Sequence, residues 1–198
     1  MTSGVGWTED YEDMHADVQE HYIKPIAARE SGHILSYLKS LKRVEEPGSQ
    51  YYYNTGDTFL LSLILSTVSH MTVADYCSER IWMPAGMEQD GYFMLDSDNG
   101  QEVTGSCCGA ALRDYARFGL LMLNDGVTQG GERILPEGWT REATTPSAPN
   151  FHKDIGDRPR IDTSGFAGYG YLWWVHHPDS FMALGAYGQW IHVELTHR

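Results

Sequence analysis

The chain has 198 residues, with 14 Lys and Arg against 27 Asp and Glu, so its formal net charge is −13. Hydrophobic residues make up 41% and charged residues 21%, values that are typical of a folded globular protein and argue against intrinsic disorder. An acidic chain without clustered Lys and Arg is poorly suited to the phosphate backbone, so we expect no nucleic-acid partner. The best apolar stretch, residues 59–68, falls short of the roughly 20 residues of a membrane helix, so we expect no membrane span.

The cysteines and the two ends of the chain say little about the compartment in which the protein works. Cys77, Cys107 and Cys108 match neither a disulfide framework nor a C-x-x-C site, and we interpret them as small buried side chains. The first residues lack the basic and apolar regions of a secretory signal. Both ends have the appearance of truncation points, so we expect the chain to be an internal part of a longer protein. That protein could be cytoplasmic or periplasmic.

Apolar periodicity predicts helices in the first three quarters of the chain. The segment 58–69 is apolar on nearly every face, which favours a buried helix. Thr72, followed by Asp75, has the pattern of an N-terminal cap. The stretch Thr144–Thr163 is rich in Pro, Asp and Ser and predicts an exposed loop. The expected helices cover residues 30–42, 58–69, 72–82, 112–123 and 136–143.

The last part of the chain has a different composition. Residues 169–176 and 181–195 are aromatic and β-branched, which favours strands, and His177-Pro-Asp-Ser180 between them is typical of a hairpin turn. The chain therefore predicts one α+β domain, mainly helical over about residues 1–145 and built of antiparallel strands over 165–198.

The sequence predicts no metal and no cofactor. The nine histidines form neither H-x-x-x-H nor H-E-x-x-H. The segment Asp96–Gly100 has its glycine at the wrong position for a calcium loop, and Gly168-Tyr-Gly170 lacks the remaining glycines of a phosphate-binding loop.

Two segments contain residue types that serve nucleophilic catalysis. Ser36-Tyr-Leu-Lys39 is a literal Ser-x-x-Lys, but both residues fall on the polar side of an amphipathic helix, which favours a solvated face. Tyr51–Asp57 is a polar aromatic cluster at the start of the helix that we expect to be the most buried. A phenol there could act as a general base if a neighbouring cation lowered its pKa. Composition alone favours purely structural tyrosines.

Several segments, in a fixed order, resemble one known family. They are Met1-Thr-Ser-Gly4, Tyr53-Asn-Thr-Gly-Asp-Thr-Phe-Leu-Leu61, Leu112-Arg-Asp-Tyr-Ala-Arg-Phe-Gly119, Gly131-Glu-Arg-Ile-Leu-Pro136, Gly168-Tyr-Gly-Tyr-Leu-Trp-Trp174 and Gly185-Ala-Tyr-Gly-Gln189. Together they are similar to the serine hydrolases of the class C β-lactamase and DD-peptidase type, particularly the branch of 6-aminohexanoate-dimer hydrolases and esterases. The resemblance implies an incomplete β-lactamase/transpeptidase-like fold, with a helical subdomain and part of an antiparallel sheet.

The resemblance also implies roles for individual residues. Tyr53 matches the catalytic tyrosine and Thr55 stands where other branches have Asn, whereas a register shifted by one residue would use Tyr52 and Asn54 instead. The strand Gly185–Gln189 would replace the family's Lys-Thr-Gly box. The backbone N–H of Ala186 would then supply half of an oxyanion hole. Tyr187 and Gln189 would line the substrate pocket.

The family's nucleophile box, Ser-x-x-Lys, belongs upstream of the segment that resembles Met1–Gly4, so Ser36 and Lys39 cannot replace it. The resemblance therefore implies a serine hydrolase of small amides or esters that works through an acyl-enzyme, and a chain that is inactive alone. DD-peptidase or β-lactamase activity is the alternative within enzymes. A non-catalytic module that binds peptide or sugar is the alternative outside them. It would use the aromatic side chains of Trp173, Trp174, Tyr187 and Trp190, for which core packing is the simpler interpretation.

Overall fold

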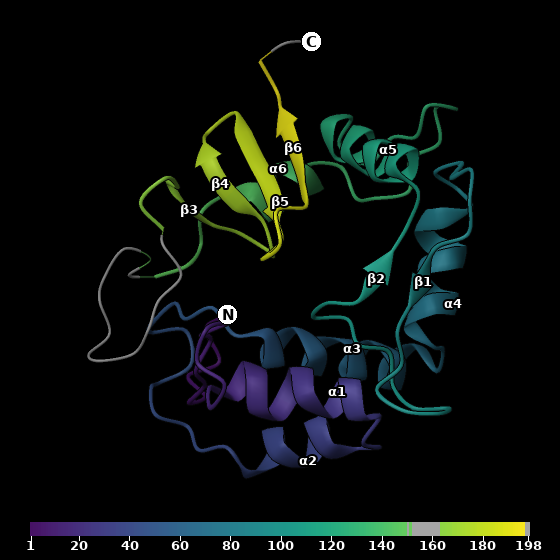
Figure 1. Ribbon diagram of the computed structural model, residues 1–198. Coiled ribbons are helices and arrows are strands. Elements are labelled where there is room, and N and C mark those ends of the chain that lie inside the picture. Colours follow the sequence, from purple (N-terminus) through teal and green to yellow (C-terminus); the bar gives the residue numbers. More distant parts are fainter. Residues whose placement is uncertain (150, 152–162, 197–198) are drawn as a thin grey trace. The chain divides into compact units, whose positions relative to one another are not determined.

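The computed structural model describes residues 1–149, 151 and 163–196 (Figure 1). The chain divides into two compact units, which we describe separately. The helical unit comprises Met1–Asp75, Tyr92–Gly109 and Pro149–Asp162, and the sheet unit comprises Tyr76–Gly91, Ala110–Ala148 and Thr163–Arg198.

The helical unit begins with a π-helix, η1 (Val18–Ile23), which continues into α1 (Lys24–Ala28). It is followed by α2 (His33–Ser40) and α3 (Thr55–Ser69), and η1, α2 and α3 pack against one another (Figure 1). Two short strands, β1 (Tyr92–Phe93) and β2 (Cys108–Gly109), pair in antiparallel fashion. The boundary between the two units falls inside α4 (Val73–Cys77).

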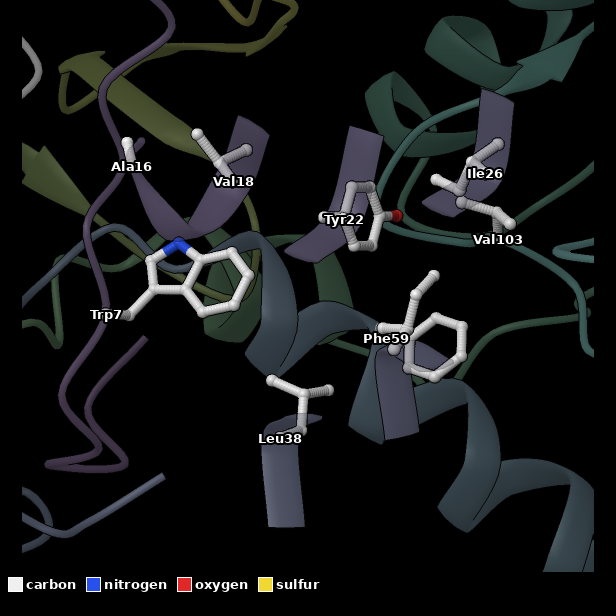
Figure 2. Packing of buried hydrophobic residues seen from close by; sticks show 9 residues of the cluster. Trp7, Ala16, Val18, Tyr22, Ile26, Leu38, Phe59 and Val103 are labelled. Atoms are coloured by element: carbon white, nitrogen blue, oxygen red, sulfur yellow. The ribbon is translucent and has the colours of Figure 1, made fainter. Parts of the chain in front are cut away.

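Aromatic and aliphatic side chains from the N-terminal segment, from η1, α1, α2 and α3, and from the loop before β2 form the core of the helical unit (Figure 2). The rings of Tyr22 and Phe59 meet edge to face, with centroids 6.3 Å apart. Figure 2 shows Trp7 and Leu38 in the same cluster, and both contact the start of α3, because a Cβ added to Gly56 would lie 2.6 Å from Leu38 and 3.2 Å from Trp7. Only glycine allows this close approach. The buried cluster consists of Trp7, Ala16, Val18, Tyr22, Ile26, Ile34, Leu38, Phe59 and Val103.

The prediction that residues 58–69 form a buried helix is correct as to the helix and wrong as to its burial. Leu61, Ile64 and Val68 are 53%, 58% and 75% exposed. They follow one another at helical spacing, so they form one stripe along α3. The helix is apolar all round, but η1 and α2 contact it from one side only.

The sheet unit has a four-stranded antiparallel sheet with strand order β3-β4-β5-β6. Helix α5 (Leu112–Leu123) packs against β6, where a Cβ on Gly119 would lie 3.2 Å from the Ile191 side chain. The core contains Met122, Ala143, Trp173, Phe181 and Val193. The remaining elements are η2 (Ser78–Trp82), α6 (Trp139–Thr144), β3 (Gly168–Tyr169), β4 (Trp174–His177), β5 (Ser180–Leu184) and β6 (Trp190–Glu194).

The structure divides both predicted strands. Residues 169–176 include the end of β3, a connection and most of β4, and residues 181–195 include β5, a turn at 185–189 and β6. The predicted strand Gly185–Gln189 is therefore a hairpin turn, closed by a hydrogen bond from the Gly185 N–H to the Gln189 carbonyl at 2.8 Å. Glycines at both 185 and 188 favour reversal of the chain over continued extension.

The prediction that the three cysteines are buried is wrong. Cys77 and Cys107 are half-buried and Cys108 is exposed. Among the described helices, none alone is long and apolar enough to cross a membrane. Within the same residues, only α3 and the helical stretch Val73–Trp82 would together be long and apolar enough, and they are bent by 79° relative to each other. Within the predicted loop 144–163, residues 150 and 152–162 lie outside the described residues.

Candidate functional site

The segment Tyr51–Thr55 leads into α3 and is held in place by backbone hydrogen bonds. The Tyr51 N–H donates to the Pro149 carbonyl and the Tyr52 N–H to the Met1 carbonyl, both at 3.0 Å. The Tyr51 ring is buried and lies 5.0 Å from the Phe151 ring, centroid to centroid. Tyr51 is thus a core residue, whereas Tyr52 and Tyr53 are half-buried.

Asn54 is the N-cap of α3. Its backbone is extended (φ −146°, ψ 102°), and its side-chain oxygen accepts the Asp57 N–H at 3.1 Å. The side chain is buried. In the register that uses Tyr52 and Asn54, Asn54 would be a residue of the catalytic box, but here its oxygen is engaged by the helix terminus.

A buried carboxylate, Glu9, accepts four hydrogen bonds at the same helix terminus. Its Oε2 accepts the Thr55 N–H at 3.0 Å and the indole N–H of Trp7. Its Oε1 accepts the Tyr11 hydroxyl at 2.6 Å and the Thr55 hydroxyl. Glu9 is only 4% exposed, so these donors take the place of water. The contacts join the N-terminal segment to the first residue of α3.

Tyr53 lies in the electrostatic field of this carboxylate. Burial, followed by the negative charge of Glu9, raises the pKa of Tyr53 to about 12. Burial and Glu9 likewise raise the pKa of Tyr11 well above its usual value. A general-base role would need a neighbouring cation to lower the phenol pKa, whereas the charged neighbour that acts on Tyr53 is the anion Glu9. Both phenols therefore keep their protons at neutral pH.

The loop before β2 packs closely on this site. A Cβ on Gly105 would lie 2.6 Å from the Tyr22 hydroxyl and 2.8 Å from the Thr55 side chain, so only glycine fits. The Ser106 hydroxyl lies 3.5 Å from the Tyr22 hydroxyl and 3.1 Å from the Cys107 sulfur. The loop therefore forms a tightly packed wall beside Thr55.

The other predicted site residues share one turn in the sheet unit. Ala186, Tyr187 and Gln189 lie between β5 and β6, and all three are exposed. The Gln189 side chain folds over Gly185, where an added Cβ would lie 2.3 Å from its Nε2 atom. The Ala186 N–H takes part in neither of the two backbone hydrogen bonds of this turn, which join Gly185 to Gln189 and Gly188 to Gly185.

The structure separates the remaining candidates. Ser36 and Lys39 both lie on the exposed side of α2, which confirms the interpretation of a solvated face. Of the four aromatic side chains considered for a binding module, Trp173 and Trp174 are buried as core residues, whereas Tyr187 and Trp190 are 83% and 63% exposed. Core packing is thus confirmed for two of the four. Within the ranges that the structure describes, no group of three or more His, Cys, Asp or Glu side chains could hold a metal ion.

Sequence reasoning missed Glu9, Tyr11 and Trp7. The only pattern they offer is alternation, with residues 7, 9 and 11 on one side of an extended segment. The contact between Glu9 and Thr55 spans 46 residues of sequence. A separation of that length leaves no local pattern that could have revealed the site.

The comparisons with known proteins agree on one family. The model of the family described as Beta-lactamase matches residues 1–197. The chain is 25% identical over 197 residues to a 6-aminohexanoate-dimer hydrolase of Paenarthrobacter ureafaciens, covering 96% of this chain and 48% of that protein. The chain thus spans about half the length of this curated relative.

Solved structures with the same fold cover nearly the whole chain. A putative 6-aminohexanoate-dimer hydrolase from Bacillus anthracis matches with a TM-score of 0.76 and 28% identity, over 98% of this chain and 50% of that one. A putative β-lactamase from Bacteroides dorei matches with a TM-score of 0.68 and 18% identity, over 98% and 58%. The predicted fold, a β-lactamase/transpeptidase-like fold present only in part, is confirmed. On the family match and the ordered motifs together, the chain belongs to the β-lactamase family.

Proposed function

We propose that the chain is the tyrosine-bearing part of a serine hydrolase that cleaves small amides or esters. The observation that carries this proposal is the position of Tyr53 directly before α3. The next residue, Asn54, caps this helix, and the first residue of the helix, Thr55, donates its N–H to the buried Glu9. Two relatives are named as hydrolases of the 6-aminohexanoate dimer, which supports an amide as the substrate class.

The proposed reaction has two steps. A serine hydroxyl attacks the substrate carbonyl, its proton is passed to the leaving amine or alcohol, and an acyl-enzyme forms. Water then attacks the acyl group, releases the acid and restores the serine. Tyr53 takes part in the proton transfer, Thr55 occupies the neighbouring polar position, and the Ala186 N–H contributes to the oxyanion hole. Tyr187 and Gln189 contact the substrate.

We further propose that the 198 residues do not catalyse this reaction alone. The Ser-x-x-Lys that they contain, at Ser36 and Lys39, is exposed on α2. Exposure to solvent gives neither side chain the enclosed, oriented environment in which a base activates a serine.

A fluorophosphonate probe and a chromogenic ester test the proposal. We expect neither labelling nor turnover with the 198-residue chain, and acylation of Ser36 would contradict this. In a product extended upstream to include a Ser-x-x-Lys, that serine should be labelled. There Tyr53→Phe should slow acylation by about 10²- to 10⁴-fold, whereas Tyr52→Phe should stay near the unsubstituted rate. Equal effects of the two substitutions would overturn the assignment of Tyr53.

A further inference from the structure

Among the described residues, the buried Glu9 carboxylate has no cationic partner. None of the ion pairs among the described residues includes Glu9. Its two oxygens instead accept hydrogen bonds from the Trp7 indole, the Tyr11 hydroxyl, and both the N–H and the hydroxyl of Thr55. A buried carboxylate surrounded by neutral donors alone is costly to assemble, which suggests a role beyond packing.

Four donors converge on the two oxygens of Glu9. Its Oε2 atom accepts two N–H groups, from the Trp7 indole and the Thr55 backbone, and its Oε1 atom accepts the hydroxyls of Tyr11 and Thr55. All four groups are donors that suit a carboxylate acceptor. The negative charge of Glu9 also acts on the Tyr53 phenol.

Glu9 also acts on the backbone that carries Tyr53. Thr55 is the first residue of α3, and its N–H is one of the donors that a helix leaves without an internal partner. Glu9 accepts this N–H, and a negative charge at a helix N-terminus is favoured by the helix dipole. The second bond, from the Thr55 hydroxyl, fixes the same residue by its side chain.

We propose that Glu9 is a positioning residue for Tyr53: it fixes the first turn of α3 through Thr55 and sets the electrostatic environment of the Tyr53 phenol. This inference rests on the proposed function, in which Tyr53 takes part in proton transfer. It deepens that function by naming the residue that anchors the backbone next to Tyr53.

The test uses the 198-residue chain labelled with ¹³C at the tyrosine Cζ atoms. The Tyr53 signal is identified by its loss in Tyr53→Phe. In Glu9→Gln we expect the Tyr53 signal to begin titrating at lower pH than in the unsubstituted chain. Hydrogen exchange of the Thr55 amide should become about tenfold faster, because a hydrogen bond to a charged acceptor is lost. Circular dichroism verifies that the chain stays folded over the pH range used.

Glu12→Gln is the matched control. Glu12 lies three residues away on an exposed stretch, and its substitution removes the same charge. Both readouts should match the unsubstituted chain. If Glu9→Gln does not fold, Glu9→Asp keeps the charge but withdraws the carboxylate by one methylene group. It should shift the Tyr53 titration in the same direction by less, and should also speed Thr55 exchange.

Two results would overturn the proposal. In the first, the Tyr53 titration is unchanged in Glu9→Gln while Thr55 exchange is faster, which would reduce Glu9 to a helix cap. In the second, neither readout changes in the folded Glu9 variant. The measurement needs no substrate and no turnover, so a failure of the proposed hydrolase activity would leave its outcome unaffected.

Discussion

The side-chain oxygen of Asn54 accepts the Asp57 N–H at 3.1 Å and so caps the helix that follows Tyr53. Replacing Asn54 by Ala should lower the free energy of unfolding by about 1 kcal/mol, because the first turn of α3 loses this acceptor. Asn54→Asp, which keeps an acceptor, should lie within a few tenths of a kcal/mol of the unsubstituted chain. Urea denaturation compares the three chains, and equal stability of Asn54→Ala would rule out the cap as a source of stability.

The core of the sheet unit depends on Phe181, which is almost fully buried between Trp173 and neighbouring side chains. Phe181→Ala should cost about 3–5 kcal/mol, since it removes buried area and leaves a cavity. Tyr187→Ala, at an 83% exposed position of the same unit, should change stability by less than about 0.5 kcal/mol. Chemical denaturation followed by tryptophan fluorescence measures both, and similar effects would contradict the assigned core.

His21 should make the helical unit less stable in mild acid. Burial lowers its pKa from the usual 6.5, although the charge of Asp17 acts in the opposite direction. The folded state therefore binds this proton less readily than the unfolded chain, and stability falls as the pH drops below about 6.5. His21→Phe keeps the stacking on Tyr37, whose ring centroid lies 3.4 Å away, and removes the titration. Urea midpoints at pH 7.5 and 5 should differ less in this variant, and an equal difference would refute the role of His21.

Asp125 should stabilise the start of α6 at neutral pH. Its carboxylate accepts the N–H groups of Gly138 at 2.7 Å and Thr140 at 3.0 Å, and these bonds, with Arg133, lower its pKa. A lowered pKa contributes stability above the unfolded value, and this contribution is lost as the pH falls through the folded value.

Asp125→Asn should therefore be less stable at pH 7 and should lose less stability than the unsubstituted chain between pH 5 and 2. Thermal unfolding at several pH values provides the measurement. The exposed Asp90→Asn is the control and should behave like the unsubstituted chain. A parallel acid profile for Asp125→Asn would show that the carboxylate makes no acid-sensitive contribution.

Local patterns in the sequence predicted much of the fold. Helix α5 occupies the predicted range 112–123, because an amphipathic pattern ends at Asn124-Asp125-Gly126. Thr72 caps the start of α4 as expected, because its hydroxyl accepts the Asp75 N–H at 3.0 Å. Helix α3 starts three residues before the predicted position, since its cap is Asn54 and the first turn is polar. The segment 18–28 was missed as a helix, because its charged residues hide the apolar face of η1.

The candidate site was less accessible to prediction than the fold. The ordered motifs predicted the family, and the role that they give to Tyr53 stays a prediction. Glu9, which accepts the Thr55 N–H, is brought to that residue by tertiary packing alone. The turn at 185–189 was read as a strand because its flanking residues are β-branched and aromatic, which outweighed the two glycines.

The exposed stripe of Leu61, Ile64 and Val68 on α3 has a consequence for how the chain behaves in concentrated solution. Apolar stripes attract one another, and the net charge of −13 opposes this attraction at neutral pH. Near the isoelectric point of about 4.9 the repulsion vanishes, and sulfate strengthens the apolar attraction at any pH. Colloidal stability should therefore be greatest above pH 7 in dilute buffer, with precipitation promoted by mild acid and by sulfate.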